Sequence, residues 1–252
     1  MYGAIIGDLA GSIYEYDQTK GIKCPNKKEL IEDESFFSDD TILTIAILDA
    51  IQSKGDYGEY LKKYINMYRN YKPNFEPYFD SSFSPNMLKW ADGDIKGNST
   101  GNGALMRISP VGYKFFNESD VIKNAIYATI PSHDSKEAIY SATTVALIIF
   151  YLRKGLDLKE IYDIVLAYPK YKEFTKFNKT CHETLNNCLY VLKNSNSFEE
   201  SIINAVNMGG DTDTNACIVG SMAEALYGID YDLKRQAESK LPKEFVRVLR
   251  RN

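Results

Sequence analysis

The feature that constrains this chain most is the stretch at residues 208–228, which reads MGGDTDTNACIVGSMAEALYG. Two carboxylates, Asp211 and Asp213, alternate with the hydroxyls of Thr212 and Thr214, and an apolar run at helical spacing follows at once. A helix start needs only one such capping group, and crowded carboxylates repel one another unless a cation or solvent compensates their charge. The stretch is therefore either an over-capped helix start that faces solvent or part of a metal site. Its ligands would all be oxygens, which favour Mg²⁺ or Mn²⁺ over zinc.

A second polar group of the same kind precedes another apolar helix. Ser38, Asp39, Asp40 and Thr41 stand together, and residues 42–51 continue with apolar side chains at helical spacing. One such group is a helix cap. Two in one chain look like two halves of a single site.

The N-terminal residues 1–16 predict a helix that begins almost at the first residue. Three glycines at i+4 spacing form a small-residue stripe that lets another backbone come close: Gly3, Gly7 and Gly11. Because each glycine lowers helix propensity by about 1 kcal/mol, tertiary contact has to hold this helix. Asp8, Ser12 and Glu15 share another face. Taken alone, that pattern favours a solvated face.

Helical patterns dominate the rest of the chain. Residues 58–70 and 135–154 predict helices, the proline-containing residues 71–90 predict a long ordered loop, and residues 231–251 predict one final helix. No segment shows the period-2 alternation of a strand, and no repeat or linker divides the sequence. We therefore predict an all-α fold with a single compact multi-helix domain over residues 1–252.

The charge and the cysteines exclude several classes of protein. A formal charge of −4 without a basic stripe argues against broad binding to nucleic acid or anionic membranes. Cys24, Cys181, Cys188 and Cys217 are too few and too scattered for a disulfide framework. A zinc site at Cys181 and Cys188 with the adjacent His182 is an alternative, but the absence of a CxxC pair favours buried thiols.

The chain start predicts the location of the protein. It has no basic region followed by a long apolar segment, and no apolar run in the sequence is long enough to span a bilayer. We expect a cytoplasmic protein.

A glycine-rich stretch and a histidine complete the informative positions. In residues 98–107, glycines flank Asn102, and the short helical run that follows is limited by Pro110. This loop either presents backbone N–H groups to an anion or is a plain turn. His133, just before a long helix, is a capping or surface residue, or, in a site that binds a nucleotide, a residue that stacks on the ligand or donates to phosphate.

Taken together, these motifs resemble the ADP-ribosylglycohydrolase family. Five stretches carry the resemblance in order over nearly the whole chain: Gly7-Asp8 with Glu15, Ser38-Asp39-Asp40-Thr41, Gly101-Asn102-Gly103 through Met106-Arg107, Ser132-His133, and Gly209-Gly210-Asp211-Thr212-Asp213-Thr214. Ser38 and Ser132 stand where many relatives have threonine, and both keep the hydroxyl. The chain is also compact for the family, so loops that recognise a modified protein are expected to be short.

The resemblance implies an all-α enzyme with two adjacent Mg²⁺ (or Mn²⁺) ions. It implies the metal ligands Ser38, Asp39, Asp40, Asp211, Asp213 and Thr214. It implies that Glu15 reaches the metal site. Our hypothesis is that Asp39, Asp40 or Glu15 assists proton transfer. The loop residues Gly101, Asn102 and Gly103, together with His133, would hold the ADP-ribose.

The function implied is hydrolysis of the N- or O-glycosidic bond between ADP-ribose and an acceptor, which passes through an oxocarbenium-like state. The partner would be an ADP-ribosylated protein or a small ADP-ribosyl compound, and a nucleic acid only as a modified substrate. Two alternatives are a catalytically silent, ADP-ribose-binding or crystallin-like relative and another Mg²⁺-dependent nucleotide hydrolase. A silent relative would be expected to lose ligands, whereas every candidate ligand here carries oxygen. An ADP-ribosylglycohydrolase would release ADP-ribose, whereas a nucleotide hydrolase would release phosphate, so the product distinguishes the two enzyme hypotheses.

Overall fold

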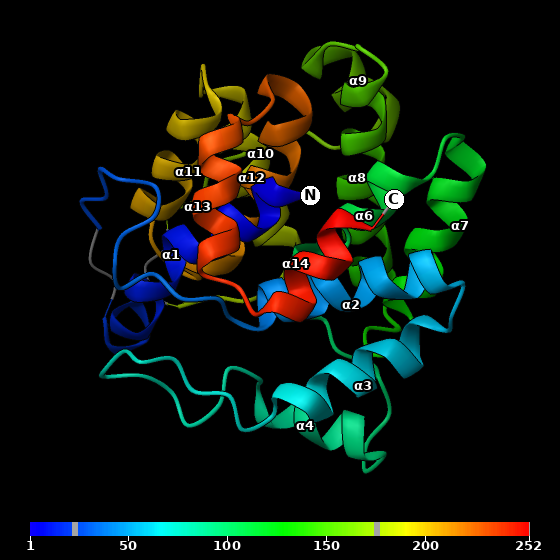
Figure 1. Ribbon diagram of the computed structural model, residues 1–252. Helices are drawn as coiled ribbons and strands as arrows, with labels where there is room; N and C mark the ends of the chain where they lie inside the picture. Colours follow the sequence, from blue (N-terminus) through cyan, green and yellow to red (C-terminus); the bar gives the residue numbers. More distant parts are fainter. Residues whose placement is uncertain (22–24, 174–176, 252) are drawn as a thin grey trace.

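The computed structural model describes residues 1–21, 25–173 and 177–251 of the chain. All regular elements in those ranges are α-helices, which confirms the predicted fold class (Figure 1). Two isolated β-bridges in those ranges join Asn98 to His133 and Gly101 to Thr180. The helices are α1 (Tyr2–Lys20), α2 (Asp39–Ser53), α3 (Tyr57–Tyr68), α4 (Pro85–Asp92), α5 (Gly103–Met106), α6 (Ser109–Lys114), α7 (Glu118–Thr129), α8 (Lys136–Arg153), α9 (Leu158–Val165), α10 (Cys181–Lys193), α11 (Phe198–Asn207), α12 (Thr212–Tyr227), α13 (Tyr231–Ser239) and α14 (Lys243–Arg250).

Helices α1 and α12 pack backbone against backbone. A Cβ added to Gly7 would lie 2.0 Å from the carbonyl oxygen of Ala216, and one added to Gly3 would lie 2.1 Å from that of Gly220. Any side chain at these glycines would push the helices apart. The predicted small-residue stripe is confirmed, and it brings the first turn of α12 against the middle of α1.

Apolar helices surround this central pair. α2 packs beside α1, α11 covers α12, and α8 contacts α12 as well as α6 and α7. Residues 40–50 of α2 are all buried, so this helix runs through the core rather than along the surface. α13 contacts α1 and α14 contacts α2, while α3 and α4 lie together at the bottom of Figure 1.

Two proline positions make the middle of the chain more helical than predicted. The expected loop at residues 71–90 contains the start of α4, where the Ser84 hydroxyl accepts a hydrogen bond from the backbone N–H of Met87 and Pro85 occupies the first turn. Pro110 likewise begins α6 instead of limiting a helical run. A proline in the first helical turn costs nothing there, because that N–H has no partner within the helix.

Helix ends also differ from the prediction at both ends of the chain. The single helix expected at residues 231–251 is wrong, because Pro242 separates α13 from α14. α1 continues to Lys20, beyond the expected residues 1–16.

The cysteines are structural. Cys181, Cys188 and Cys217 are free and buried, which confirms the buried-thiol interpretation for these three, and Cys24 lies outside the described residues. The Cys181 thiol donates to the carbonyl oxygen of Gly101 at 2.9 Å. No helix in the described ranges is both long and apolar enough to cross a membrane.

Candidate metal centre and ligand pocket

Asp8 joins α1 to the start of α2. It is fully buried, and its carboxylate accepts hydrogen bonds from the backbone N–H and the hydroxyl of Ser38 at 2.9 and 2.7 Å, and from the N–H of Thr41 at 3.1 Å. The solvated interpretation of its helix face is therefore wrong, and it is wrong as well for Ser12 and Glu15, which are buried. The polar face of α1 points into the interior, where it holds the first turn of α2.

Carboxylates from three helices converge at this point. One group combines Asp8, Asp40 and Asp213, and a second combines Glu15, Asp211 and Asp213. In each group one oxygen per residue lies within 4.8 Å of the others, and all members are buried. Asp213 belongs to both groups, so the two halves recognised in the sequence form one continuous cluster.

The cluster leaves two buried carboxylate oxygens without a hydrogen bond, although one of them, Oδ1 of Asp211, lies 3.5 Å from Nζ of Lys179. Oδ1 of Asp40 and Oδ1 of Asp211 are buried and accept no hydrogen bond from the described residues. Oδ2 of Asp40 accepts from the hydroxyls of Ser38 and Thr214, each at 3.2 Å. Unpaired buried oxygens on carboxylates are costly unless a cation binds them, and an all-oxygen donor set suits a hard divalent ion.

The electrostatics of the cluster agree with that conclusion. Burial raises the pKa of Asp40 and of Asp213 well above the ordinary range, and the neighbouring carboxylates add to the shift. Burial likewise raises the pKa of Glu15. Without added positive charge, these groups resist ionising together. The residues present therefore fit bound divalent cations.

Lys179, on the segment before α10, supplies positive charge from the protein itself. Its Nζ lies 2.9 Å from Oε1 of Glu15 and 3.5 Å from Oδ1 of Asp211, and its side chain is half exposed. Burial lowers the pKa of Lys179, but the charges of Asp211 and Glu15 outweigh that effect and raise the pKa above its usual range. Sequence analysis did not identify Lys179, because no motif around it marks a site.

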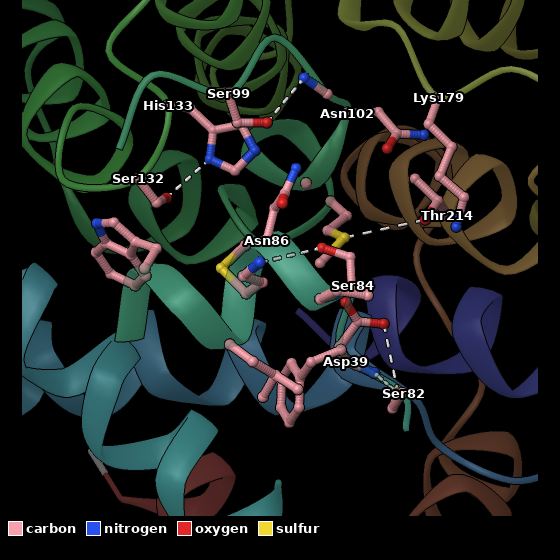
Figure 2. Close-up of a pocket in the computed structure, with 18 of the residues that line it drawn as sticks. Asp39, Ser82, Ser84, Asn86, Ser99, Asn102, Ser132, His133, Lys179 and Thr214 are labelled. Atoms are coloured by element: carbon pink, nitrogen blue, oxygen red, sulfur yellow. Dashed lines mark hydrogen bonds between the residues drawn. The ribbon is translucent and has the colours of Figure 1, made fainter. Parts of the chain in front are cut away.

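A pocket of about 780 Å³ opens from the carboxylate cluster. All but one of the candidate site residues line it: Glu15, Asp39, Asp40, Gly101, Asn102, Gly103, His133, Asp211, Asp213 and Thr214. Ser38 lies beneath the lining with its hydroxyl directed at the carboxylates of Asp8 and Asp40. In Figure 2, His133 lies on one side of the pocket and Lys179 and Thr214 on the other, with Asp39 below. Residues 79–90, absent from the sequence-based site, contribute much of the outer wall.

Asp39 sits where the cluster meets the pocket. It is partly buried, its backbone N–H donates to the Ser82 hydroxyl at 2.7 Å, and that hydroxyl donates to Oδ1 of Asp39 at 3.4 Å (Figure 2). The segment at residues 79–90 thus holds the first residue of α2 in place.

The glycine-rich loop holds the cluster from the other side. The side-chain amide of Asn102 donates to Oδ2 of Asp211 at 2.7 Å. Its backbone N–H donates to the carbonyl oxygen of Lys179 at 2.8 Å, and the N–H of Gly101 donates to the hydroxyl oxygen of Ser99 at 3.1 Å. These two N–H groups are therefore engaged within the chain and are not free to bind an anion.

His133 is buried and is not a surface residue. Its Nδ1 lies 2.8 Å from the Ser132 hydroxyl, which accepts a hydrogen bond from Nη2 of the buried Arg107 at 2.6 Å. Burial lowers the pKa of His133 well below its usual value, and the charge of Arg107 lowers it further.

Comparison with known proteins identifies the family. The model of the ADP-ribosylglycohydrolase family matches residues 1–251. The chain belongs to this family. The sequence is 27% identical over 285 residues to a putative ADP-ribosyl glycohydrolase of Acanthamoeba polyphaga mimivirus, covering 90% of this chain and 85% of the relative. It is 23% identical over 265 residues to the ADP-ribosylarginine hydrolase Tri1 of Pseudomonas putida, covering 91% and 70%.

The fold agrees with that assignment. A solved structure described as an ADP-ribosylglycohydrolase-related protein complex superimposes with a TM-score of 0.68 at 20% identity, covering 98% of this chain and 90% of the other. The chain is thus an ADP-ribosylglycohydrolase, an enzyme that hydrolyses glycosidic bonds of ADP-ribose. Its family is metal-dependent, and its buried carboxylates are able to bind metal.

Proposed function

We propose that this chain is a two-metal hydrolase that releases ADP-ribose from an acceptor by cleaving an N- or O-glycosidic bond. The observation that carries the proposal is the pair of buried carboxylate groups that share Asp213 and open into the pocket. We assign two Mg²⁺ or Mn²⁺ ions to this cluster. Their proposed ligands are Ser38, Asp39, Asp40, Asp211, Asp213 and Thr214.

Asp8 has a different role from the proposed ligands, although it belongs to one carboxylate group. Both of its oxygens already accept hydrogen bonds from Ser38 and Thr41. We assign it to orienting Ser38 and the first turn of α2, as outer residues commonly orient metal ligands.

Glu15 and Asp39 are the carboxylates best placed for proton transfer, with Asp40 behind them. Bound divalent ions would supply positive charge to ionise the carboxylates and lower the pKa of a coordinated water. Glu15 lines the pocket, and burial raises its pKa above the ordinary range of a carboxyl group, which favours a role in proton transfer. An oxocarbenium-like transition state would gain from the negative charge of these side chains.

Arginine-linked ADP-ribose is the first acceptor to test, because one relative is named an ADP-ribosylarginine hydrolase. Serine-linked ADP-ribose, an ADP-ribosylated nucleic-acid base and O-acetyl-ADP-ribose complete the panel. The single domain over residues 1–252 and the cytoplasmic location remain predictions.

The test combines activity with metal stoichiometry. EDTA-treated protein should be inactive, and Mg²⁺ or Mn²⁺ should restore release of ADP-ribose without release of phosphate. Calorimetric titration with Mn²⁺ should give two ions per chain. Full activity after chelation, or one ion per chain, would refute the two-metal proposal. Release of phosphate would favour a nucleotide hydrolase. Binding of ADP-ribose without turnover would favour a catalytically silent relative.

A further inference from the structure

The hydrogen bonds around His133 fix the position of its proton. An arginine guanidinium only donates, so the Ser132 oxygen is the acceptor in its 2.6 Å contact with Nη2 of Arg107. The Ser132 hydroxyl has one proton, and Nδ1 of His133, at 2.8 Å, is its other hydrogen-bond partner among the described residues. The arrangement that uses every group has Ser132 donating to Nδ1. Nδ1 is then unprotonated, and the ring proton lies on Nε2.

We propose that Arg107 and Ser132 hold His133 as the neutral Nε2–H tautomer, so that it offers a fixed N–H donor to an oxygen of the ADP-ribosyl group. The identity of the ligand rests on the proposed function, whereas the tautomer does not. Arg107 and Ser132 are positioning residues, and His133 is the residue that contacts the ligand. The Nε2–H donor is preorganised for binding, because hydrogen bonds within the protein fix its orientation.

Packing supports this direction for the ring. His133 lines the pocket, and its Nε2 lies 3.3 Å from the point where a Cβ on Gly103 would be. A Cβ at that position would crowd the nitrogen, so glycine leaves room beside it. On the other side, the backbone of His133 is held by a bridge to Asn98, and a Cβ on Gly97 would lie 2.0 Å from the carbonyl oxygen of Pro131.

Arg107 also determines which chemistry His133 can perform. The guanidinium is fully buried, and its Nε and Nη1 have no hydrogen-bond partner among the described residues. This buried positive charge, two hydrogen bonds from the imidazole, opposes a second positive charge on the ring. His133 therefore acts as a neutral donor rather than as a proton carrier, which leaves proton transfer to the carboxylates.

The tautomer can be observed directly. The chain has two histidines, His133 and His182, so nitrogen-15 labelling gives few ring signals. At neutral pH, long-range proton–nitrogen correlation should show His133 with a protonated Nε2 and an unprotonated Nδ1. Ser132→Ala should give a mixture of tautomers at His133, Ser132→Thr should restore the single form, and the His182 signals should not move. A proton on Nδ1 in the unmutated protein, or no change in Ser132→Ala, would overturn the proposal.

Binding of ADP-ribose tests the second part. The ligand selects the Nε2–H form from a mixture of tautomers, so binding in Ser132→Ala should weaken by the inverse of that form's fraction, about 2-fold for an even mixture. Ser132→Thr should bind nearly normally. Unchanged affinity despite an altered tautomer would refute the contact between His133 and the ligand. If the unmutated protein neither binds ADP-ribose nor hydrolyses its conjugates, the proposed function fails while the spectrum still decides the tautomer. If Ser132→Ala does not fold, the spectrum of the unmutated protein is sufficient.

Discussion

Replacing Lys179 by methionine should lower the stability of the metal-free protein and increase the affinity of the site for metal. In the structure its ammonium group bridges Glu15 and Asp211 at 2.9 and 3.5 Å. A divalent ion bound by Asp211 has to displace this ammonium or share the carboxylate with it. We therefore expect Lys179 to stabilise the metal-free protein and to compete with the metal.

The size of the effect follows from distance and exposure. Opposite charges about 4 Å apart interact by about 1 kcal/mol in water and about 4 kcal/mol at the effective dielectric constant of a protein surface. The Lys179 side chain is 51% exposed, so screening and the entropy of the long side chain reduce the gain. A net contribution of about 1–2 kcal/mol remains for the two contacts together.

Two measurements check this reasoning. In metal-free protein, Lys179→Met should lower the Tm by about 2–8 °C, given about 2–4 °C per kcal/mol for a chain of this size. If the lysine is displaced on metal binding, linkage requires Mn²⁺ to bind the variant roughly 5- to 30-fold more tightly. Titration calorimetry and thermal melts with and without Mn²⁺ measure both quantities.

The control is Lys172→Met on the same segment. Lys172 pairs with Glu183 outside the pocket, so its loss should leave the affinity for Mn²⁺ unchanged. The reasoning fails if Lys179→Met lowers the Tm equally with and without saturating Mn²⁺, or if its affinity matches that of the unmutated protein.

Three further changes test the rest of the site. Glu15→Gln should reduce turnover by roughly 10²-fold or more with the Tm of the metal-loaded protein nearly unchanged; normal turnover would remove this carboxylate from the reaction. Asp213→Asn should weaken the binding of both ions, so the rise in Tm that Mg²⁺ causes should largely disappear. A normal rise in Tm would contradict the role of Asp213 as a ligand shared by both ions. Gly7→Ala should destabilise the fold by at least about 1–3 kcal/mol because its methyl group would lie 2.0 Å from the carbonyl oxygen of Ala216. Gly21→Ala, where nothing lies within 4 Å of the added methyl group, is the matched control and should melt nearly normally.

The two polar groups that begin α2 and α12 were predictable from sequence, because the signal in each lies within four consecutive residues. The groups at residues 38–41 and 211–214 each place more carboxylates and hydroxyls at a helix start than capping requires, so each is recognisable without knowledge of the fold. Their roles as metal ligands stay predictions. The all-α class was equally accessible, because helical periodicity and capping act over a few residues.

The contacts that sequence reasoning missed join residues that are far apart in the chain. Asp8 binds the start of α2 thirty positions away, and a buried face looks the same in sequence as a solvated one when it carries three polar residues. Lys179 reaches Glu15 across 164 positions, and the intervening chain contains no pattern that predicts this contact. The break at Pro242, in contrast, was marked in the sequence, and the prediction of one helix at residues 231–251 gave the proline too little weight.

The close approach of α1 and α12 connects the stability of the fold to the geometry of the site. A Cβ on Gly11 would lie 2.4 Å from Cα of Asp213, so the glycine stripe touches the very turn that supplies the shared carboxylate. Glu15 lies one turn further along α1, on the side where it joins Asp211 and Asp213 in one group. The distance between the helix axes thus sets the distance between carboxylates that are far apart in the sequence. Because only glycine permits this approach, the low helix propensity of α1 is a consequence of building the cluster from two helices in backbone contact.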